Sequence, residues 1–330
     1  MTESACPTKR RDLLLRIACM TLVPASAPAW SQAGNVTRIV VPFTPGASND
    51  VIGRMMAEAA ARRSGTNWIV ENKPGAGSML GADAVAKAAP DGRTLLLCAT
   101  ANMGILPAIQ KSMRYSVEHD FTFLVRIASS PFALAVNTQL PAASFADFVR
   151  LAKDRPGAMR FGSAGVGSLD YMGANLLQAQ LGLDLNIIPY KGMAPVLNDL
   201  RAGHIDACIV SPPTVRPLVL DGKVRVLAVL DERRSELLPN VPSSTELGHA
   251  SLKVGNWWGI AGPAKMDPAM VTSLRQVLMQ VLTDPAFLSA LKEKGFDPAV
   301  QSGEAFTQFV LADLKHWKSL AQHAKVSIDE

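Results

Sequence analysis

The sequence has little of what several classes of protein depend on. Only 4 of its 330 residues are cysteine, 6% are aromatic, and its 5 histidines are scattered. No cluster of lysine and arginine is interleaved with aromatic residues, so we expect no nucleic-acid partner. No G-x-S-x-G nucleophile elbow occurs. His204 and Cys208 form the one pair at a ligand-like spacing, but the apolar run around Cys208 is typical of a strand, so no metal site is predicted.

One glycine pattern imitates a cofactor motif. Residues 75–81 read Gly-Ala-Gly-Ser-Met-Leu-Gly, which resembles a dinucleotide fingerprint. The true fingerprint also needs an acidic residue about 20 positions further on, at a strand end. Asp91 lies too early, in a Pro-Asp-Gly turn. We therefore expect no cofactor and interpret the segment as a connection that passes close to its neighbours.

The N-terminus carries the pattern of an export signal. Residues 9–11 are basic, residues 13–29 are largely apolar, and Ser31-Gln32-Ala33 is a small-x-small cleavage pattern. Arg16 and two prolines interrupt the apolar stretch, which disfavours a membrane anchor. The pattern predicts a cleaved signal peptide over 1–33 and a periplasmic protein. Whether export uses the Sec or the twin-arginine route stays open.

Cleavage would leave a mildly basic chain with two cysteines. The net charge falls from +5 to +3, because residues 1–33 hold four basic and two acidic residues. Cys98 and Cys208 lie in apolar, strand-like runs. Buried free thiols are the favoured interpretation, and a disulfide between them is the alternative in an oxidising compartment.

The pattern along the chain is α/β. Apolar runs predict strands at 37–41, 67–71, 94–98, 132–136, 159–161, 185–188, 206–210 and 224–229. Amphipathic stretches predict helices at 50–64, 78–88, 144–153, 168–181, 193–202 and 213–221. This alternation indicates parallel sheets with crossovers. Asp-Pro starts then predict consecutive helices at 267–283 and 285–294, followed by one at 304–324. The length of the mature chain favours two lobes.

Two loops of small residues stand out, at 42–50 and 162–168. Each follows a short strand-like run and opens a helix. A helix N-terminus presents unpaired backbone N–H groups and partial positive charge, so it suits a carboxylate or a phosphate. Two such loops behind an export signal predict a cleft that holds one small anion from both sides.

These segments also carry a family resemblance. The chain resembles the Bug family, the extracytoplasmic receptors of tripartite tricarboxylate transporters. The resemblance covers nearly the whole mature chain and rests on motifs at 38–50, 70–77, 89–95, 163–168, 189–192, 199–203, 222–229, 238–242 and 258–263. Together these motifs are specific, although each alone is weak.

The resemblance implies an α/β, two-lobe periplasmic-binding-protein fold (Venus flytrap, type II-like) with a ligand cleft between the lobes. Lobe 1 would comprise 34–135 plus 258–330, and lobe 2 would comprise 136–257. It also implies a monomer that delivers a small organic carboxylate to membrane permease subunits. The implied ligand-binding residues are Phe43, Ala47, Ser48, Asn49, Asp50, Ser163, Ala164, Gly165, Val166, Gly167 and Ser168.

Several roles stay open at this point. Asp50 either caps its helix and orders the loop or contacts the ligand directly. Phe43 packs either on the ligand or in the core. Ala47 and Ser48 replace glycines that are common in the family, and Tyr171 stands where a histidine is usual. These departures leave the identity of the carboxylate undetermined.

Three functions compete: a transport receptor, a sensor subunit for a signalling partner, and an exported α/β enzyme that acts on a carboxylate. The enzyme would need a nucleophile–base pair or a metal cluster, and the sequence offers neither. Receptor and sensor use the same cleft, so the sequence does not separate them. The receptor is the favoured interpretation.

Overall fold

The computed structural model describes residues 36–46 and 48–327, which form helices and strands arranged around two sheets. The predicted signal peptide over 1–33, and Ala47 of the first predicted loop, lie outside the described residues. None of the helices in this described part combines the length and the apolar character that a membrane span needs.

The first sheet has six strands in the order β11-β4-β10-β3-β1-β2. Their bounds are β1 (Val36–Val41), β2 (Asn67–Asn72), β3 (Thr94–Ala99), β4 (Phe121–Pro131), β10 (Gly255–Pro263) and β11 (Asp297–Ser302). β1 pairs in parallel with β2 and β3, whereas β10 runs antiparallel to β3 and β4. The prediction of parallel sheets was therefore wrong for the part of this sheet formed by β4, β10 and β11. These three strands were also not predicted.

The second sheet has five strands in the order β7-β6-β8-β5-β9. They are β5 (Ala133–Asn137), β6 (Met159–Ser163), β7 (Leu185–Pro189), β8 (Ala207–Val210) and β9 (Val224–Val229). β6 pairs in parallel with β7 and β8, and β5 runs antiparallel to β8 and β9. The chain passes between the sheets twice, from β4 to β5 and from β9 to β10. The exact bounds of the two predicted lobes stay a prediction.

All nine predicted helices are present, with small shifts of their ends. They are α2 (Ser48–Ser64), α3 (Met79–Ala86), α5 (Phe145–Asp154), α6 (Leu169–Leu181), α7 (Met193–Ala202), α8 (Pro212–Leu220), α9 (Pro268–Leu282), α10 (Pro285–Glu293) and α11 (Gly303–Ala324). Short helical turns occur at η2 (Ala76–Ser78), η3 (Ala101–Ile105) and α4 (Leu106–Ile109). The side chains of Asp267 and Asp284 cap α9 and α10 as their Asp-Pro starts indicate.

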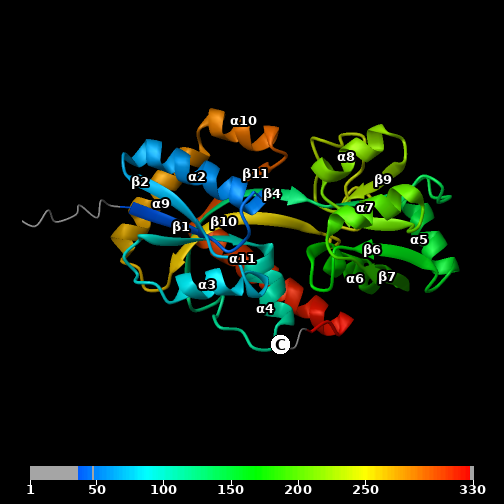
Figure 1. Ribbon diagram of the computed structural model, residues 1–330, viewed down its shortest axis with the longest axis horizontal. Coiled ribbons are helices and arrows are strands. Elements are labelled where there is room, and N and C mark those ends of the chain that lie inside the picture. Colours follow the sequence, from blue (N-terminus) through cyan, green and yellow to red (C-terminus); the bar gives the residue numbers. More distant parts are fainter. Residues whose placement is uncertain (1–35, 47, 328–330) are drawn as a thin grey trace, which may run out of the picture. The chain divides into compact units, whose positions relative to one another are not determined.

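Helices cover both faces of the first sheet. Figure 1 shows α2 and α9 on one side of it and α3 and α11 on the other. The two tryptophans of β10 follow this division, because neighbouring residues of a strand point to opposite faces. Trp257 packs on the α3 and α11 side and Trp258 on the α2 and α9 side. This pair therefore belongs to the core of the sheet.

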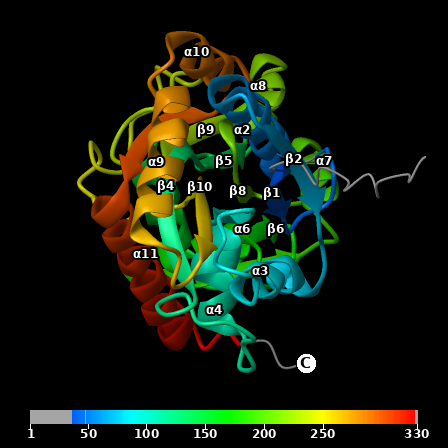
Figure 2. The same ribbon diagram turned by 90° about the vertical axis from the view of Figure 1, so that its left-hand side faces the viewer.

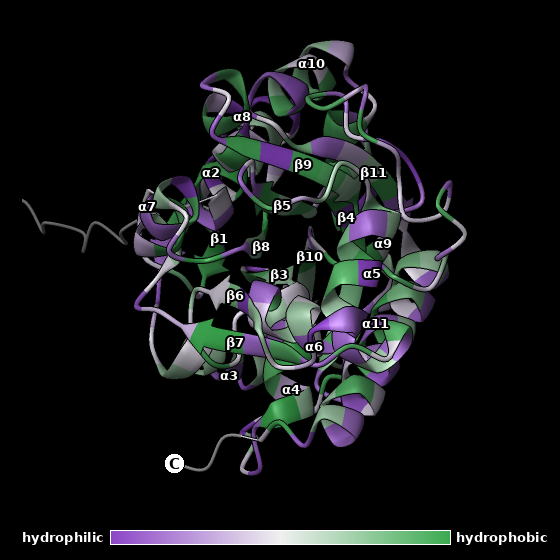
Figure 3. Ribbon diagram, turned by 90° about the vertical axis from the view of Figure 1, so that its right-hand side faces the viewer, coloured by the Kyte–Doolittle hydropathy of each residue, from purple (hydrophilic) through white to green (hydrophobic). Residues whose placement is uncertain are grey.

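The last helix joins both halves of the protein. Figure 2 shows α11 running alongside β4 of the first sheet. Its C-terminal half places Trp317, Leu320 and Ala321 in the hydrophobic core that also holds Phe148 of α5 and Leu177 of α6. Figure 3 shows the green strand β5 of the second sheet beside helices whose colours alternate between green and purple. The buried residues that α5 and α6 contribute to this core, such as Phe148 and Leu177, are apolar.

Both cysteines of the described chain are buried and free. They lie in different cores, Cys98 in β3 and Cys208 in β8. The favoured interpretation is confirmed, and the alternative disulfide is wrong.

Candidate functional site

The first predicted loop lies between β1 and α2, where the sequence predicts it. Asp50 is in the first turn of α2, and its side chain is only 5% exposed. One carboxylate oxygen accepts hydrogen bonds from the backbone N–H of Gly46 and from Arg54 Nε, each at 2.9 Å. The other accepts from Asn72 Nδ2 at 2.8 Å. Asp50 thus ties the loop, its own helix and the end of β2 together.

These contacts fix the charge state of Asp50. Burial alone would raise its pKa, but the hydrogen bonds from Arg54, Gly46 and Asn72 outweigh burial and lower the pKa to about 2. Arg54 also neutralises the carboxylate as an ion pair at 2.9 Å. An anionic ligand beside this loop would therefore meet little net negative charge.

Two further contacts hold the first loop against the core. Trp258 Nε1 donates to Asn49 Oδ1 at 2.6 Å, which links β10 to the start of α2. Phe43 packs partly buried against the core on the α2 side, and its carbonyl oxygen accepts from Asn72 Nδ2 at 3.2 Å. Gly46 has a φ of +85°, a conformation that favours glycine. Ser48 is exposed at the N-terminus of α2.

The second predicted loop lies between β6 and α6 and is built in a similar way. Asp170, in the first turn of α6, is buried, and its carboxylate accepts from the backbone N–H of Ala164 at 2.5 Å. Ser168 is the N-cap residue. Its Oγ accepts from Tyr171 N at 3.3 Å and donates to the carbonyl of Gly165 at 2.7 Å. Side chains of the helix therefore close this loop, as in the first one.

The two carboxylates differ in their electrostatics. Asp170 forms no ion pair with another described residue. Burial raises the pKa of Asp170, and the hydrogen bond from Ala164 N offsets only part of that effect. Asp50 is held ionised by a cation, whereas Asp170 is held closer to neutrality by burial.

Backbone donors remain available in the second loop. Within the described part of the chain, the N–H groups of Gly165, Val166 and Gly167 donate to no acceptor. Gly165 and Gly167 have φ of +136° and +81°, backbone conformations that residues with a side chain rarely adopt. The Val166 side chain is 55% exposed. Ser163 ends β6 with a buried Oγ that has no hydrogen-bond partner among these residues.

A neighbouring turn supports the second loop. Gly192 N donates to the carbonyl of Ala164 at 3.0 Å, and a Cβ on Gly165 would lie 3.3 Å from the carbonyl oxygen of Tyr190. Tyr190 is itself held by a hydrogen bond from its hydroxyl to Asp199 at 2.6 Å. The turn that contains Lys191 therefore packs against the second loop and supports it.

The described residues hold no group of three or more potential metal ligands. His204 is exposed and contacts Asp199 at 3.3 Å, while Cys208 lies in a strand. The predicted site residues other than Ala47 fall into two clusters, one at each loop. Sequence reasoning missed the contacts of Asp170 with Ala164 and of Asn72 with Asp50 and Phe43, which hold the two loops.

Comparison with known proteins gives one consistent result. Residues 52–326 match the family described as the tripartite tricarboxylate transporter family receptor. The chain is 30% identical over 301 residues to protein BugT of Bordetella pertussis, which covers 91% of this chain and 92% of BugT.

Two solved structures are similar over most of their length. Rpa4515 of R. palustris, solved with adipate, has a TM-score of 0.74 and 28% identity, covering 88% of this chain and 97% of that one. MatC from Rhodopseudomonas palustris, solved with bound malate, has a TM-score of 0.68 and 26% identity, covering 86% of this chain and 98% of that one.

Proposed function

Because the chain belongs to the family of tripartite tricarboxylate transporter receptors, we propose that it captures a small organic carboxylate in the periplasm and delivers it to the permease of such a transporter. It has the α/β, two-lobe fold of periplasmic solute-binding proteins. It acts as a monomer that binds its ligand between the lobes and releases it unchanged.

The observation that carries this proposal is the similar construction of the two loops. Each loop joins a strand end to a helix N-terminus and is closed by a buried aspartate that accepts a backbone N–H of the loop. Because the aspartates occupy the N–H groups of Gly46 and Ala164, the donors left for a ligand in the second loop are those of residues 165–167. Backbone dipoles, with no basic side chain in either loop, suit a carboxylate.

The binding cycle follows from this geometry. A ligand carboxylate held by both loops is bound more tightly in the closed arrangement of the lobes than in the open one, so ligand binding favours closure. The closed form then presents the surface that the permease recognises. Adipate and malate, the ligands of two similar proteins, make a dicarboxylate of four to six carbons the first class to test.

Substitutions in the second loop test the site. Gly165→Pro removes the N–H donor of residue 165. In both Gly165→Pro and Gly167→Val the backbone leaves its positive φ, so the remaining N–H donors of the loop turn away from the ligand. Each lost donor to a charged group contributes about 1.5–3 kcal/mol, so we expect binding of the dicarboxylate to weaken by at least about tenfold. Isothermal titration calorimetry with adipate and malate measures the change.

Gly222→Val is the matched control. Gly222 also has a positive φ, +65°, but it lies in the turn before β9, away from both loops. We expect it to lower the melting temperature about as much as the loop variants and to leave affinity unchanged. Full affinity in Gly165→Pro and Gly167→Val would contradict the proposed site.

A further inference from the structure

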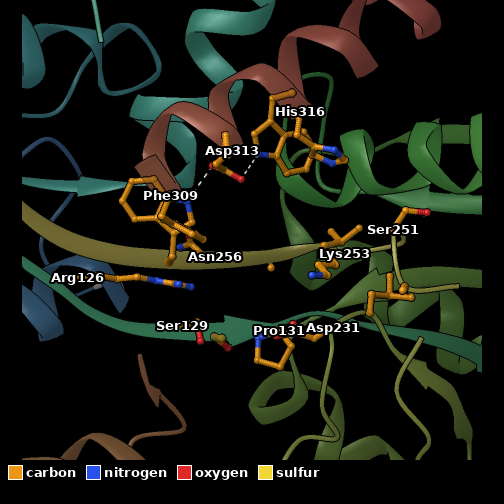
Figure 4. Close-up of a pocket in the computed structure, with 18 residues that line it drawn as sticks. Arg126, Ser129, Pro131, Asp231, Ser251, Lys253, Asn256, Phe309, Asp313 and His316 are labelled. Atoms are coloured by element: carbon orange, nitrogen blue, oxygen red, sulfur yellow. Dashed lines mark hydrogen bonds between the residues drawn. The ribbon is translucent and has the colours of Figure 1, made fainter. Parts of the chain in front are cut away.

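A cavity lies beside the two crossovers between the sheets. It has a volume of about 410 Å³, and none of the predicted ligand-binding residues lines it. Its walls come from β4, from β10, from the segment between β9 and β10, and from α11 (Figure 4). It is therefore distinct from the site formed by the two loops.

Arg126 of β4 contributes a cation that forms no ion pair within the described residues, although Asp231, Asp313 and Glu232 act on it electrostatically. Its guanidinium carbon lies 3.8 Å from the ring centroid of Phe309. Its Nη1 donates to Gln301 at 3.3 Å, whereas its buried Nε has no acceptor within the described chain. Burial lowers the pKa of Arg126 to about 10, so the group stays charged at neutral pH. A buried charged donor without an acceptor is costly.

Two carboxylates face the same space, and neither forms an ion pair within the described residues. Asp231 accepts one hydrogen bond, from Glu232 N at 2.6 Å. Asp313 accepts from the indole N–H groups of Trp257 and Trp317 at 2.8 and 3.0 Å, shown dashed in Figure 4. Burial raises the pKa of both carboxyl groups, that of Asp313 to about 6.

The other charged group of the wall already has a partner, since Lys253 forms an ion pair with Glu232. His316 Nε2 is buried without a hydrogen-bond partner among the described residues, and burial lowers the pKa of His316, so it is neutral at pH 7. Trp257, Phe309 and Trp317 supply an aromatic wall.

We propose that this cavity binds a small zwitterion of the α-amino-acid class. Its carboxylate accepts hydrogen bonds from Arg126, its ammonium group donates to Asp231, and its side chain lies against the aromatic wall. A dianion would set a second negative charge beside two carboxylates, and a simple cation would leave Arg126 without an acceptor. A zwitterion can place its carboxylate beside Arg126 and its ammonium group beside Asp231 at the same time.

The direct test is calorimetric titration of the full protein with glycine, alanine, proline and phenylalanine. We expect at least one of them to bind with a stoichiometry of one. The N-acetyl derivative of that amino acid lacks the ammonium group, and its carboxamide derivative lacks the carboxylate. Each derivative should bind at least about tenfold more weakly, as the loss of a charge-assisted hydrogen bond predicts. No binding by any of the four, or equal binding by the derivatives, would overturn the proposal.

Protein variants locate the site. Arg126→Gln and Asp231→Asn should weaken amino-acid binding at least about tenfold and leave dicarboxylate binding at the loops intact. Arg234→Gln, which removes an exposed ion pair with Glu246 in the same crossover segment, is the matched control and should change neither. In Gly167→Val, binding of the dicarboxylate should be lost and binding of the amino acid should be unchanged. Amino-acid binding that survives Arg126→Gln, or disappears in Gly167→Val, would place the ligand elsewhere and refute the assignment.

Discussion

At the scale of single residues, two aspartates set the shape of the proposed binding loops by different electrostatic means. Asp50 is paired with Arg54 and has a pKa lowered to about 2, although burial opposes the shift. It therefore stays ionised throughout the physiological range. Asp170 has no such cation, and burial raises its pKa. Of the two, Asp170 is the carboxylate that can respond to a change of pH.

This difference predicts a pH dependence of binding. A ligand carboxylate beside Asp170 disfavours its ionised form, which raises its pKa further in the complex. Binding then takes up protons, so affinity rises as pH falls toward the pKa of Asp170. Asp170→Asn keeps an oxygen that accepts from Ala164 N and removes the charge. We expect this variant to bind at least as tightly at pH 8 and to show a flatter pH profile by calorimetry.

Asp50→Asn is the comparison variant. Because Asp50 is ionised in both the free and the bound protein at these pH values, its replacement should leave the slope of the pH profile unchanged. Equal slopes for wild type and Asp170→Asn would contradict the role given to Asp170.

At the scale of elements, β4, β10 and β11 show where the sequence is insufficient. β10 contains three glycines, which in a sequence usually indicate a turn. In the structure a Cβ on Gly259 would lie 2.7 Å from the carbonyl oxygen of Val125, so this glycine permits close approach of backbones. β11 contains Pro298 and is an edge strand, where proline is tolerated. Such reasons depend on partners distant in sequence.

The helices and the two loops were predictable because their signals are local. Asp-Pro starts and amphipathic spacing identify α9 and α10, and small residues after a strand-like run identify both loops. The role of Asp170 was not predictable in the same way. Its contact with Ala164 requires the loop to fold back onto α6, and the turn at Tyr190 and Gly192 reaches this loop only through the pairing of β6 with β7.

The contact between α11 and β10 predicts a pH effect on stability. Burial raises the pKa of Asp313 to about 6 in the folded protein, against an ordinary value of 3.8, despite hydrogen bonds from two indoles. The folded state thus holds this proton more firmly than the unfolded state. Its stabilising effect is complete below about pH 4 and is lost as pH rises through about 6, on the order of 3 kcal/mol in all.

Asp313→Asn tests this effect. Between pH 4 and 6.5 the free energy of unfolding of the wild type should fall relative to that of the variant, as measured by urea denaturation at several pH values. Parallel curves for the two proteins would show that Asp313 titrates normally.

At the scale of the whole molecule, α11 is the element that binds the two sheets into one structure. Trp317 is 2% exposed and packs in the core of the second sheet, although α11 also lies along β4 of the first. Trp317→Ala should lower the free energy of unfolding by about 3–5 kcal/mol. Lys318 lies on the same helix, and Lys318→Ala, which removes its exposed ion pair with Glu118, should cost less than about 1 kcal/mol.

Urea denaturation measures both changes. The expected loss in Trp317→Ala reflects burial between the two halves of the protein, so the transition should also lose cooperativity. A loss no larger than that of Lys318→Ala would contradict this role of α11.

The most direct test of the central claim is a thermal-shift titration of the purified protein with organic acids, combined with an assay of each acid before and after incubation. The acids are adipate, malate, C3 and tricarboxylic acids, aromatic carboxylates, acidic amino acids and nicotinate. A ligand at 100 times its dissociation constant adds about 2.7 kcal/mol of stability. A carboxylate receptor predicts a saturable rise in melting temperature for one class of acid, absent in Gly167→Val, with the acid recovered unchanged. For an acid that lacks an α-amino group, a rise that persists in Gly167→Val would contradict it, as would conversion of any acid to a product.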